Sequence, residues 1–302
     1  MIGAIRNVLV KHFVDADPDP RRTLLLTSAG RGGSTWLAEL LNYRNDFRYM
    51  FEPFYAGEVP AAAAFANWQY LAPDEDSPTH LRFATEVLTG RLRHDRVDMY
   101  NRRLFCSRRL VKEVRANLMI GWLAENLPGM KIIYLLRHPL ATVRSRLAHT
   151  PAMNLDAEFL SQEKLVRDHL QPHLDLIAHA RTDFEKHVTA WCIEYLVAEH
   201  QIGRCEHRTV YYELLCTDPD RELRRLMDYA SIPVDSPRLA RAVRRPSATA
   251  LDRATAISKG DDLVDTWRSA FTDDQVRWAF ETIEAFGLSG MYGSGLMPLQ
   301  RD

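Results

Sequence analysis

The sequence predicts an α/β fold in which a parallel sheet lies between two layers of helices. Short apolar runs at residues 23–27 and 132–136 are typical of strands that are buried on both faces of a parallel sheet. Each run is followed by apolar residues at helical spacing, and the alternation continues with a strand at 207–212 and a helix at about 221–229. We therefore expect a single three-layer domain over residues 1–302.

The first two units each consist of a strand, a loop and a helix. After the first strand and a glycine-rich turn, apolar side chains at positions 36, 37, 40 and 41 place one face of a helix against the sheet. The second strand ends at Arg137, and Pro139 is well placed to open a helix that runs to about Leu147. Each loop is therefore expected at the carboxyl end of its strand.

The remaining regular elements are weaker or more isolated. They are a strand at 111–114, an amphipathic helix at 118–127 and a long helix at 184–200. Thr272 is a capping residue for the last helix, and Gly287 is its expected stop. We expect the tail from Ser289 to be loosely held.

Two stretches, 59–101 and 150–183, fit the alternation poorly. The first contains the turn-rich segment P-D-E-D-S-P, and the second is rich in charge and histidine. Long loops inside a compact domain are usually functional. We interpret both stretches as irregular insertions around a site.

Composition excludes several classes of protein. The chain has 39 Lys+Arg against 40 Asp+Glu, a formal net charge of −1, so a generally basic nucleic-acid-binding surface is not indicated. Its 4 cysteines form no C-x-x-C pair and have no histidine at zinc-finger spacing, which argues against a structural metal and favours a reducing compartment. No apolar run reaches the roughly 20 residues of a membrane span, so we expect a cytoplasmic protein. The sequence does not predict the oligomeric state.

The glycine-rich turn at residues 28–35 has the features of an anion site. A helix that begins after Gly30, Gly32 and Gly33 presents unpaired backbone N–H groups, and Ser34 and Thr35 add hydroxyl donors. A tight turn without a ligand is the alternative interpretation.

The nucleoside-triphosphate version of such a loop is not matched. In the signature G-x-x-x-x-G-K-[ST], Ser28 occupies the position of the first glycine and Ser34 that of the lysine. The strand at 132–136 ends in Arg137 instead of the acidic residue that would hold magnesium, which favours a second anionic group over a metal.

Three segments resemble the sulfotransferase family, which uses 3′-phosphoadenosine-5′-phosphosulfate (PAPS). The segment T-S-A-G-R-G-G-S-T-W-L at 27–37 resembles its 5′-phosphosulfate loop, and R-H-P-L-A-T-V-R-S at 137–145 resembles its 3′-phosphate motif R-D-P-R-D-x-x-x-S. The segment Y-E-L-L-C-T-D-P at 212–219 is similar to a third family segment, Y-E-D-L-L-x-x-P. The resemblance covers about 23–58 and 112–229 and implies a PAPS-dependent enzyme on a nucleotide-kinase-like (P-loop NTPase-like) fold.

The resemblance also implies roles for individual residues. The 5′ end of the nucleotide would be held by Gly30, Arg31, Gly32, Gly33, Ser34, Thr35 and Trp36. Within this group, Arg31 would stabilise charge on the bridging oxygen, whereas the Trp36 side chain is expected mainly to pack. Arg137 and Ser145 would hold the 3′-phosphate, with Lys259 and Gly260 beside them, and Tyr212 would contact the adenine.

This chain departs from the family pattern at three places. Arg31 stands in place of the loop lysine of cytosolic members, and His138 in place of the usual aspartate. The late segment R-K-G-x-x-G-D-W survives only as S-K-G at 258–260, with Trp267 displaced. The third departure puts the covering of the 3′-phosphate in doubt.

A general base is expected at Glu52. The segment Phe51-Glu52-Pro53 resembles the F-E-P motif of carbohydrate-type and several bacterial sulfotransferases, and a buried neighbourhood would raise the pKa of this carboxyl toward a useful value. Lys112 and Arg115 follow the middle strand and are candidates for contacting the sulfonate or the acceptor; ordinary strand-end charges are the alternative.

The expected acceptor is a small molecule with a hydroxyl group, on a carbohydrate, a lipid or a secondary metabolite, and the transfer needs no metal. The histidines of the second insertion lack the i, i+4 pairing of a helical metal site and are expected on the surface or in the acceptor pocket. Two other functions stay open: a P-loop kinase or NTPase with a divergent loop, which would bind ATP with magnesium, and a non-catalytic nucleotide-binding relative.

Overall fold

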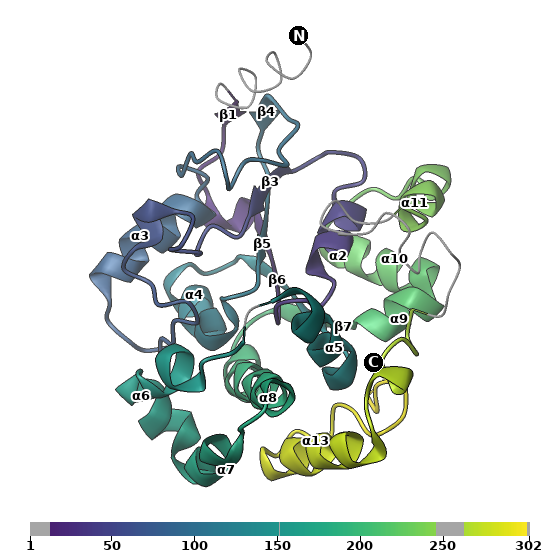
Figure 1. The fold of residues 1–302 in the computed structure, drawn as a ribbon. Coiled ribbons are helices and arrows are strands. Elements are labelled where there is room, and N and C mark those ends of the chain that lie inside the picture. Colours follow the sequence, from purple (N-terminus) through teal and green to yellow (C-terminus); the bar gives the residue numbers. More distant parts are fainter. Residues whose placement is uncertain (1–12, 151, 246–262, 301–302) are drawn as a thin grey trace.

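A five-stranded sheet with all neighbours parallel forms the centre of the molecule. The computed structural model describes residues 13–150, 152–245 and 263–300. The strands follow the order β3-β5-β2-β6-β7, with bounds Arg48–Phe51, Arg109–Glu113, Thr23–Ser28, Lys131–Leu136 and His207–Tyr211 (Figure 1). The expected α/β fold with a parallel sheet is confirmed.

The pairing register brings the carboxyl ends of the strands to one edge. The central strand β2 pairs with β5 through Leu26 and Lys112, and with β6 through Ser28 and Leu135. Because all pairs are parallel, the loops that follow β2, β3, β5 and β6 leave the sheet on the same side. A common site for these loops therefore follows from the strand order.

Successive residues of β2 face two separate apolar layers. Leu24 and Leu26 belong to one buried cluster, and Leu25 belongs to the other. Both faces of the strand are covered by helices, which explains why the strand appears as an unbroken apolar run. The layer around Leu24 is formed by α2 (Ser34–Leu41), α9 (Tyr212–Thr217), α10 (Pro219–Tyr229) and α11 (Ser236–Val243).

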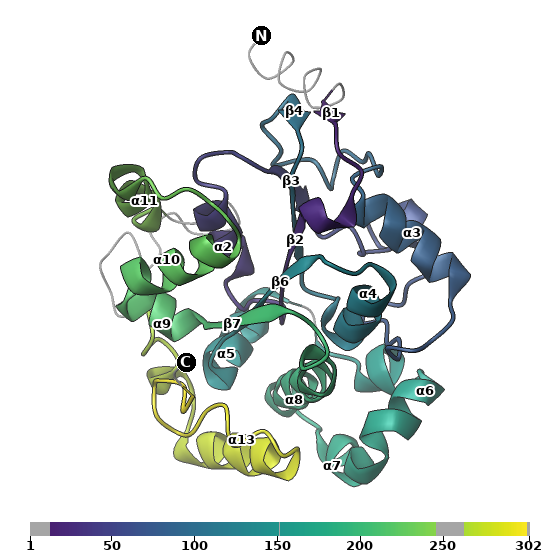
Figure 2. The same cartoon turned by 180° about the vertical axis from the view of Figure 1, so that it is seen from behind.

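The opposite layer is larger and is built around α8 (Asp183–Ile202). This helix packs against α4, α5 and α13, whose bounds are Ile120–Asn126, Pro139–His149 and Asp273–Ala285. Figure 2 shows α2, α10 and α11 on one side of the strands and α3, α4 and α8 on the other. Three short 3-10 helices lie in the segments between these elements: η1 (Pro20–Arg22), η3 (Asn117–Met119) and η7 (Arg268–Ala270).

The two insertions form short helices and contact each other. The first holds η2 (Pro60–Ala62) and α3 (Pro78–Leu88), and the second holds η4 (Asp156–Leu160), α6 (Glu163–Leu165), η5 (Val166–Leu170), η6 (Gln171–His173) and α7 (Leu174–His179). Tyr70 of the first insertion donates its backbone N–H to Gln162 Oε1 at 2.8 Å and its hydroxyl to Asp168 Oδ2 at 3.0 Å. The two stretches therefore support each other.

Helix ends follow the expected capping. Thr272 caps α13 by accepting the N–H of Gln275, and Gly287 has the left-handed φ of +74° that ends the helix. A small parallel sheet of β1 (Val14–Asp15) and β4 (Phe105–Cys106) was not expected, because strands of 2 residues carry no periodic pattern.

The tail is packed against the body of the protein, so the expectation of a loosely held tail is wrong. Tyr292 is 1% exposed, and its hydroxyl donates to Glu213 Oε2 at 2.7 Å. The other oxygen of Glu213 accepts the backbone N–H of His138 at 2.9 Å. An aromatic ring with a buried hydrogen bond therefore ties the tail to the start of α5.

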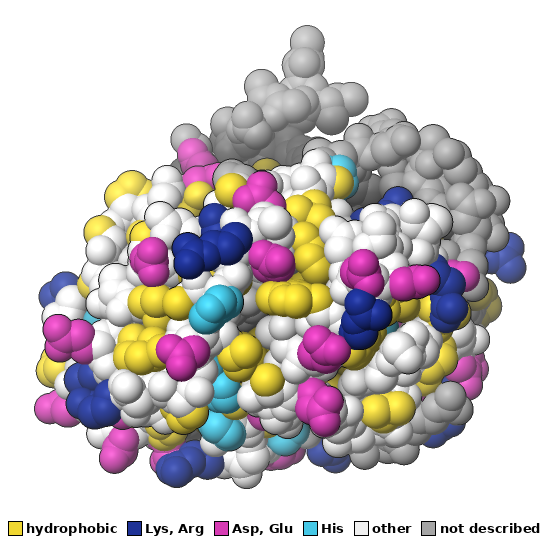
Figure 3. Space-filling view, turned by 60° about the horizontal axis from the view of Figure 1, so that its bottom comes forward, with side chains coloured by type: hydrophobic (Ala, Val, Ile, Leu, Met, Phe, Trp, Pro, Cys, Tyr) yellow, Lys and Arg dark blue, Asp and Glu magenta, His cyan; other side chains and the backbone are white. Residues whose placement is uncertain are grey.

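In the described ranges, every helix is too short or too polar to cross a membrane. Figure 3 views the end of the molecule that carries α7 and α13, and there acidic and basic side chains are interspersed without gathering into a patch of one sign.

We predict that Tyr292→Phe lowers the free energy of unfolding by about 1–3 kcal/mol, because it leaves a buried carboxylate short of one donor. Urea denaturation measures the change. Tyr43→Phe is the control: its hydroxyl donates to the Pro233 carbonyl at 3.0 Å and accepts the Asp235 N–H at 2.6 Å, but neither partner is a buried carboxylate and water can reach the site, so the loss should be smaller. Equal losses for the two variants would contradict the role of Tyr292.

Candidate functional site

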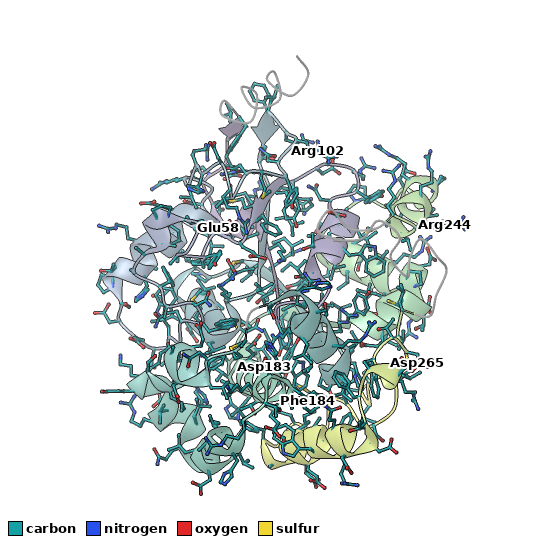
Figure 4. All side chains as sticks on the ribbon, viewed as in Figure 1. Glu58, Arg102, Asp183, Phe184, Arg244 and Asp265 are labelled. Atoms are coloured by element: carbon teal, nitrogen blue, oxygen red, sulfur yellow. The ribbon has the colours of Figure 1, made fainter. Side chains whose placement is uncertain are left out.

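One large pocket lies at the carboxyl edge of the sheet. Its volume is about 1250 Å³, and the ends of β2, β3, β5 and β6 contribute to its lining together with α5, α8 and both insertions. Glu58, labelled in Figure 4, belongs to the wall next to the first insertion. Residues of both insertions line this pocket, and their role around a functional site stays a prediction.

The glycine-rich loop after β2 is folded as a tight turn into α2. Gly33 is the N-cap of α2 with φ +92°, and a Cβ atom there would come within 2.5 Å of the Tyr212 ring. Arg31 also has a left-handed φ, +70°. Glycine is therefore required at position 33 by conformation and by space. The first N–H groups of a helix have no partner within the helix, so this end of α2 suits an anion.

Most loop residues predicted to bind the nucleotide line the pocket. The lining includes Gly30, Arg31, Gly33, Ser34, Thr35 and Trp36, whereas Gly32 lies in the turn without reaching the pocket surface. Trp36 is 5% exposed and packs edge-on against Tyr212 at 5.8 Å, in agreement with the expected packing role.

The tip of β6 meets this loop. Arg137 donates from NH1 to the Arg31 carbonyl at 3.0 Å, and Arg31 donates from Nε to Ser145 Oγ at 3.0 Å. In the described part of the chain neither guanidinium has a carboxylate partner, and Arg137 Nε is buried without an acceptor. Burial and the nearby Arg137 charge lower the pKa of Arg31. Among the described residues these two neighbouring cations have no carboxylate at ion-pair distance, an arrangement that suits an anion.

Some predicted contacts lie elsewhere or outside the described residues. Arg31, expected at the bridging oxygen, contacts Ser145, which is the residue expected at the 3′-phosphate. Tyr212 lies next to the loop, and the Arg137 guanidinium lies over its ring at 4.3 Å from the ring centre. The contact of Tyr212 with adenine stays a prediction. Lys259 and Gly260 fall outside the described residues.

Glu52 follows β3 directly and is held by β5. Its backbone N–H donates to the Lys112 carbonyl at 2.8 Å, and its Oε1 lies 2.5 Å from Lys112 Nζ. Its Oε2 lies 3.1 Å from Arg115 NH1 and 3.6 Å from Arg96 NH2. The structure thus brings the three residues predicted around the acceptor together, and it adds Arg96, which the sequence analysis missed.

The expected rise in the pKa of Glu52 is wrong. Burial does push this pKa upward, but the charges of Lys112, Arg115 and Arg96 outweigh it and hold the pKa below the ordinary 4.5. Burial lowers the pKa of Lys112 in turn, and Glu52 opposes that change. Glu52 is therefore ionised throughout the neutral range and takes up a proton only in acid.

Aromatic and amide side chains continue the pocket beyond Glu52. Arg115 donates from Nε to Asn67 Oδ1 at 2.7 Å, and its guanidinium lies 3.8 Å from the ring centre of Tyr55. Trp68 and Tyr100 also line this part of the pocket. The sequence analysis missed these residues because they lie in or beside an irregular insertion, and only the position of the insertion signalled them.

Arg146 supports the loop from α5 and was also missed. It donates from Nε to the Gly30 carbonyl at 3.1 Å and from NH2 to both oxygens of Glu194, at 2.7 and 3.0 Å. The pair is buried, so Arg146 holds the loop carbonyl in place. The only indication in the sequence was that Arg146 directly follows Ser145, a residue of the predicted 3′-phosphate motif.

The described histidines do not gather into a metal site. His149 and His187 line the pocket, and burial lowers the pKa of His187 to about 4. Burial also lowers the pKa of His138 to about 3, where the ring stacks on Trp267. Among the described residues, no three His, Cys, Asp or Glu side chains are placed to hold a metal ion.

Comparison with known proteins gives one family match. Residues 24–236 match the model described as the sulfotransferase family. No curated protein matches the sequence.

Comparison with solved structures gives further matches, all of low sequence identity. The chain is similar to mouse sulfotransferase SULT7A1 complexed with PAP, at 17% identity over 94% of this chain and 92% of that chain, with a TM-score of 0.48. It is similar to the sulfotransferase domain of the Synechococcus PCC 7002 olefin synthase, at 18% identity over 91% and 98%, with a TM-score of 0.46. It is also similar to retinol dehydratase in a complex with retinol and PAP, at 14% identity over 89% of this chain and 81% of that chain, with a TM-score of 0.48.

We predict that Lys112→Met raises the pKa of Glu52, because the closest cation is removed while the burial remains. Carbon-13 NMR of labelled glutamate carboxyl groups measures the titration, with the Glu52 signal assigned by its loss in Glu52→Gln. Lys164→Met is the control, since Lys164 pairs with Glu75 outside the pocket. An unchanged Glu52 titration in Lys112→Met would contradict the assigned cause.

Proposed function

Because the chain belongs to the sulfotransferase family, we propose that it moves a sulfonate group from PAPS to an acceptor hydroxyl and releases 3′-phosphoadenosine-5′-phosphate (PAP). The observation that supports this most directly is the meeting of Arg31, Arg137 and Ser145 in the pocket that also contains Glu52. A nucleotide with phosphate groups at both ends of its ribose fits such an arrangement.

The residues at the nucleotide end suit the two phosphate groups. The N–H groups at the start of α2 and the hydroxyls of Ser34 and Thr35 would bind the 5′-phosphate. Arg137 and Ser145 would bind the 3′-phosphate, and the unpartnered Nε of Arg137 offers a donor for it. A bound anion would attract both guanidinium groups and offset the repulsion between Arg31 and Arg137.

The strand order suits a donor and an acceptor that lie at different places in the pocket. The sheet places β5 between β2, which carries the glycine-rich loop, and β3, which leads to Glu52. Lys112 and Arg115 at the end of β5 therefore lie between the nucleotide end and the base. We assign to them the neutralisation of charge next to Glu52 and the orientation of its carboxylate.

Glu52 is the proposed general base. When bound, PAPS supplies the sulfonate: a new bond joins the acceptor oxygen to sulfur, and the bond from sulfur to the 5′-phosphate oxygen breaks. Glu52 accepts the hydroxyl proton, for which its ionised state at neutral pH is required. Its lowered pKa makes it a weak base, so proton transfer has to accompany bond formation, which acidifies the hydroxyl.

We infer an uncharged acceptor, of the carbohydrate, lipid or secondary-metabolite kind. The pocket volume of about 1250 Å³ exceeds the roughly 300–1,000 Å³ of a single small-ligand site and leaves room beside a nucleotide. Lys112, Arg115 and Arg96 already contact carboxylates, so they are not free to bind an acidic acceptor.

We predict that Glu52→Gln lowers kcat for transfer of labelled sulfonate by about 10²- to 10⁴-fold, because the proton acceptor is lost. PAP affinity should stay within about threefold, since Glu52 belongs to the acceptor end. A screen of mixed hydroxyl acceptors with the wild-type protein supplies the assay.

Glu75→Gln is the matched control for this variant. Glu75 also pairs with a lysine, at 2.7 Å from Lys164, and has a similar side-chain exposure of 16% against 13% for Glu52, but it lies outside the pocket. Unchanged turnover in Glu52→Gln would remove Glu52 as the base, and a loss of PAP binding with turnover would indicate a structural role.

A further inference from the structure

Glu113, the last residue of β5, is a buried carboxylate without a cationic partner at contact distance among the described residues. It is 0% exposed. Its oxygens accept only backbone N–H groups: from Phe54 at 2.9 Å, from Val114 at 2.8 Å and from Arg115 at 3.1 Å. A buried charge that is compensated only by amides is costly, so its position needs a physical reason.

The three amides belong to the two segments that carry the Glu52–Arg115 ion pair. Oε2 binds Phe54, two residues after Glu52, and Oε1 binds the backbone of Arg115 itself. The guanidinium of Arg115 then lies 3.1 Å from Glu52 Oε2. One carboxylate therefore connects the backbone on both sides of the ion pair.

The turn that Glu113 holds has an unfavourable conformation. Glu52 has φ +46°, in the left-handed region that a residue with a side chain rarely adopts. Pro53 has no N–H group, so the backbone of the turn is attached to β5 through the Glu52 N–H on the Lys112 carbonyl and the Phe54 N–H on Glu113. Such a conformation persists only where the surroundings impose it.

We propose that Glu113 is a positioning residue for the reaction: its carboxylate fixes Glu52 and Arg115 relative to each other and keeps the proton-accepting oxygen in place. The inference rests on the proposed function for its effect on turnover. The effect of Glu113 on the pKa of Glu52 can be measured whether or not the protein transfers sulfonate.

A positioning role and a simple charge effect of Glu113 would shift the pKa of Glu52 in opposite directions. Burial, and then the nearby negative charge of Glu52, raise the pKa of Glu113. The repulsion is reciprocal, so a charged Glu113 also disfavours the ionisation of Glu52. If Glu113 acted only through its charge, removing the charge would lower the pKa of Glu52. If Glu113 holds the ion pair together, its removal loosens Arg115 and Lys112 from Glu52, and the pKa rises.

The test uses Glu113→Gln, which keeps the shape but loses the charge and one acceptor oxygen. Carbon-13 titration of Glu52 should show a raised pKa, kcat should fall at least about tenfold, and PAP affinity should stay within about twofold. A lowered or unchanged Glu52 pKa overturns the proposal, and so does an equal loss of kcat and PAP affinity.

Glu113→Asp separates position from charge, and it replaces Glu113→Gln if that variant does not fold. It keeps the charge but is one methylene too short to reach both segments, so the Glu52 pKa should again rise; an unchanged value contradicts the proposal. In a Glu52→Gln background, Glu113→Gln should have no further effect on kcat.

The control is Glu222→Gln, another buried carboxylate, which pairs with Arg225 at 2.9 Å on α10 and is not part of the pocket. It should leave the Glu52 titration unchanged. If the wild-type protein transfers no sulfonate to any acceptor, the proposed function fails, while the titration still decides the role of Glu113.

Discussion

The parallel pairing of β6 with β2 is the constraint on which the site depends. It sets Leu135 beside Ser28, so the segments that follow the two strands leave the sheet next to each other. Arg137 then reaches the loop backbone and Arg31 reaches Ser145, across more than a hundred residues of sequence. A shift of this register would separate the two cations and remove the place where one ligand can contact both segments.

Charge is distributed unevenly between the two ends of the pocket. At the proposed nucleotide end, Arg31 and Arg137 stand close together and have no carboxylate at ion-pair distance among the described residues. At the other end, Glu52 is surrounded by Lys112, Arg115 and Arg96. The first end therefore suits an anion, whereas at the second end the cations already contact Glu52 and keep it ionised.

Much of the fold, and the position of the glycine-rich loop at the proposed nucleotide end, could be predicted from the sequence, because these features are local. An apolar run, a glycine-rich turn and an apolar helical face define β2, its loop and α2 without reference to distant residues. Glu52 could be predicted in the same way, from the F-E-P segment and the expected end of a strand. Strands as short as β1 and β4 leave no such pattern.

The properties that depend on contacts between distant segments could not be predicted. The pKa of Glu52 is set by cations from β5 and from the first insertion, and sequence alone suggested only the burial that opposes them. Glu113 looks like an ordinary strand residue until its two oxygens are seen to bind separate segments. Tyr292 likewise gave no sign that it would pair with Glu213.

Calorimetric titration of the wild-type protein with PAP and with 5′-AMP, without added metal, tests the central claim most directly. If the two strand ends together bind one nucleotide, the 3′-phosphate should add about 1.5–3 kcal/mol through its charge-assisted hydrogen bonds, so PAP should bind about 10- to 100-fold more tightly. Equal affinity for PAP and 5′-AMP, or tighter binding of ATP with magnesium, would contradict the account.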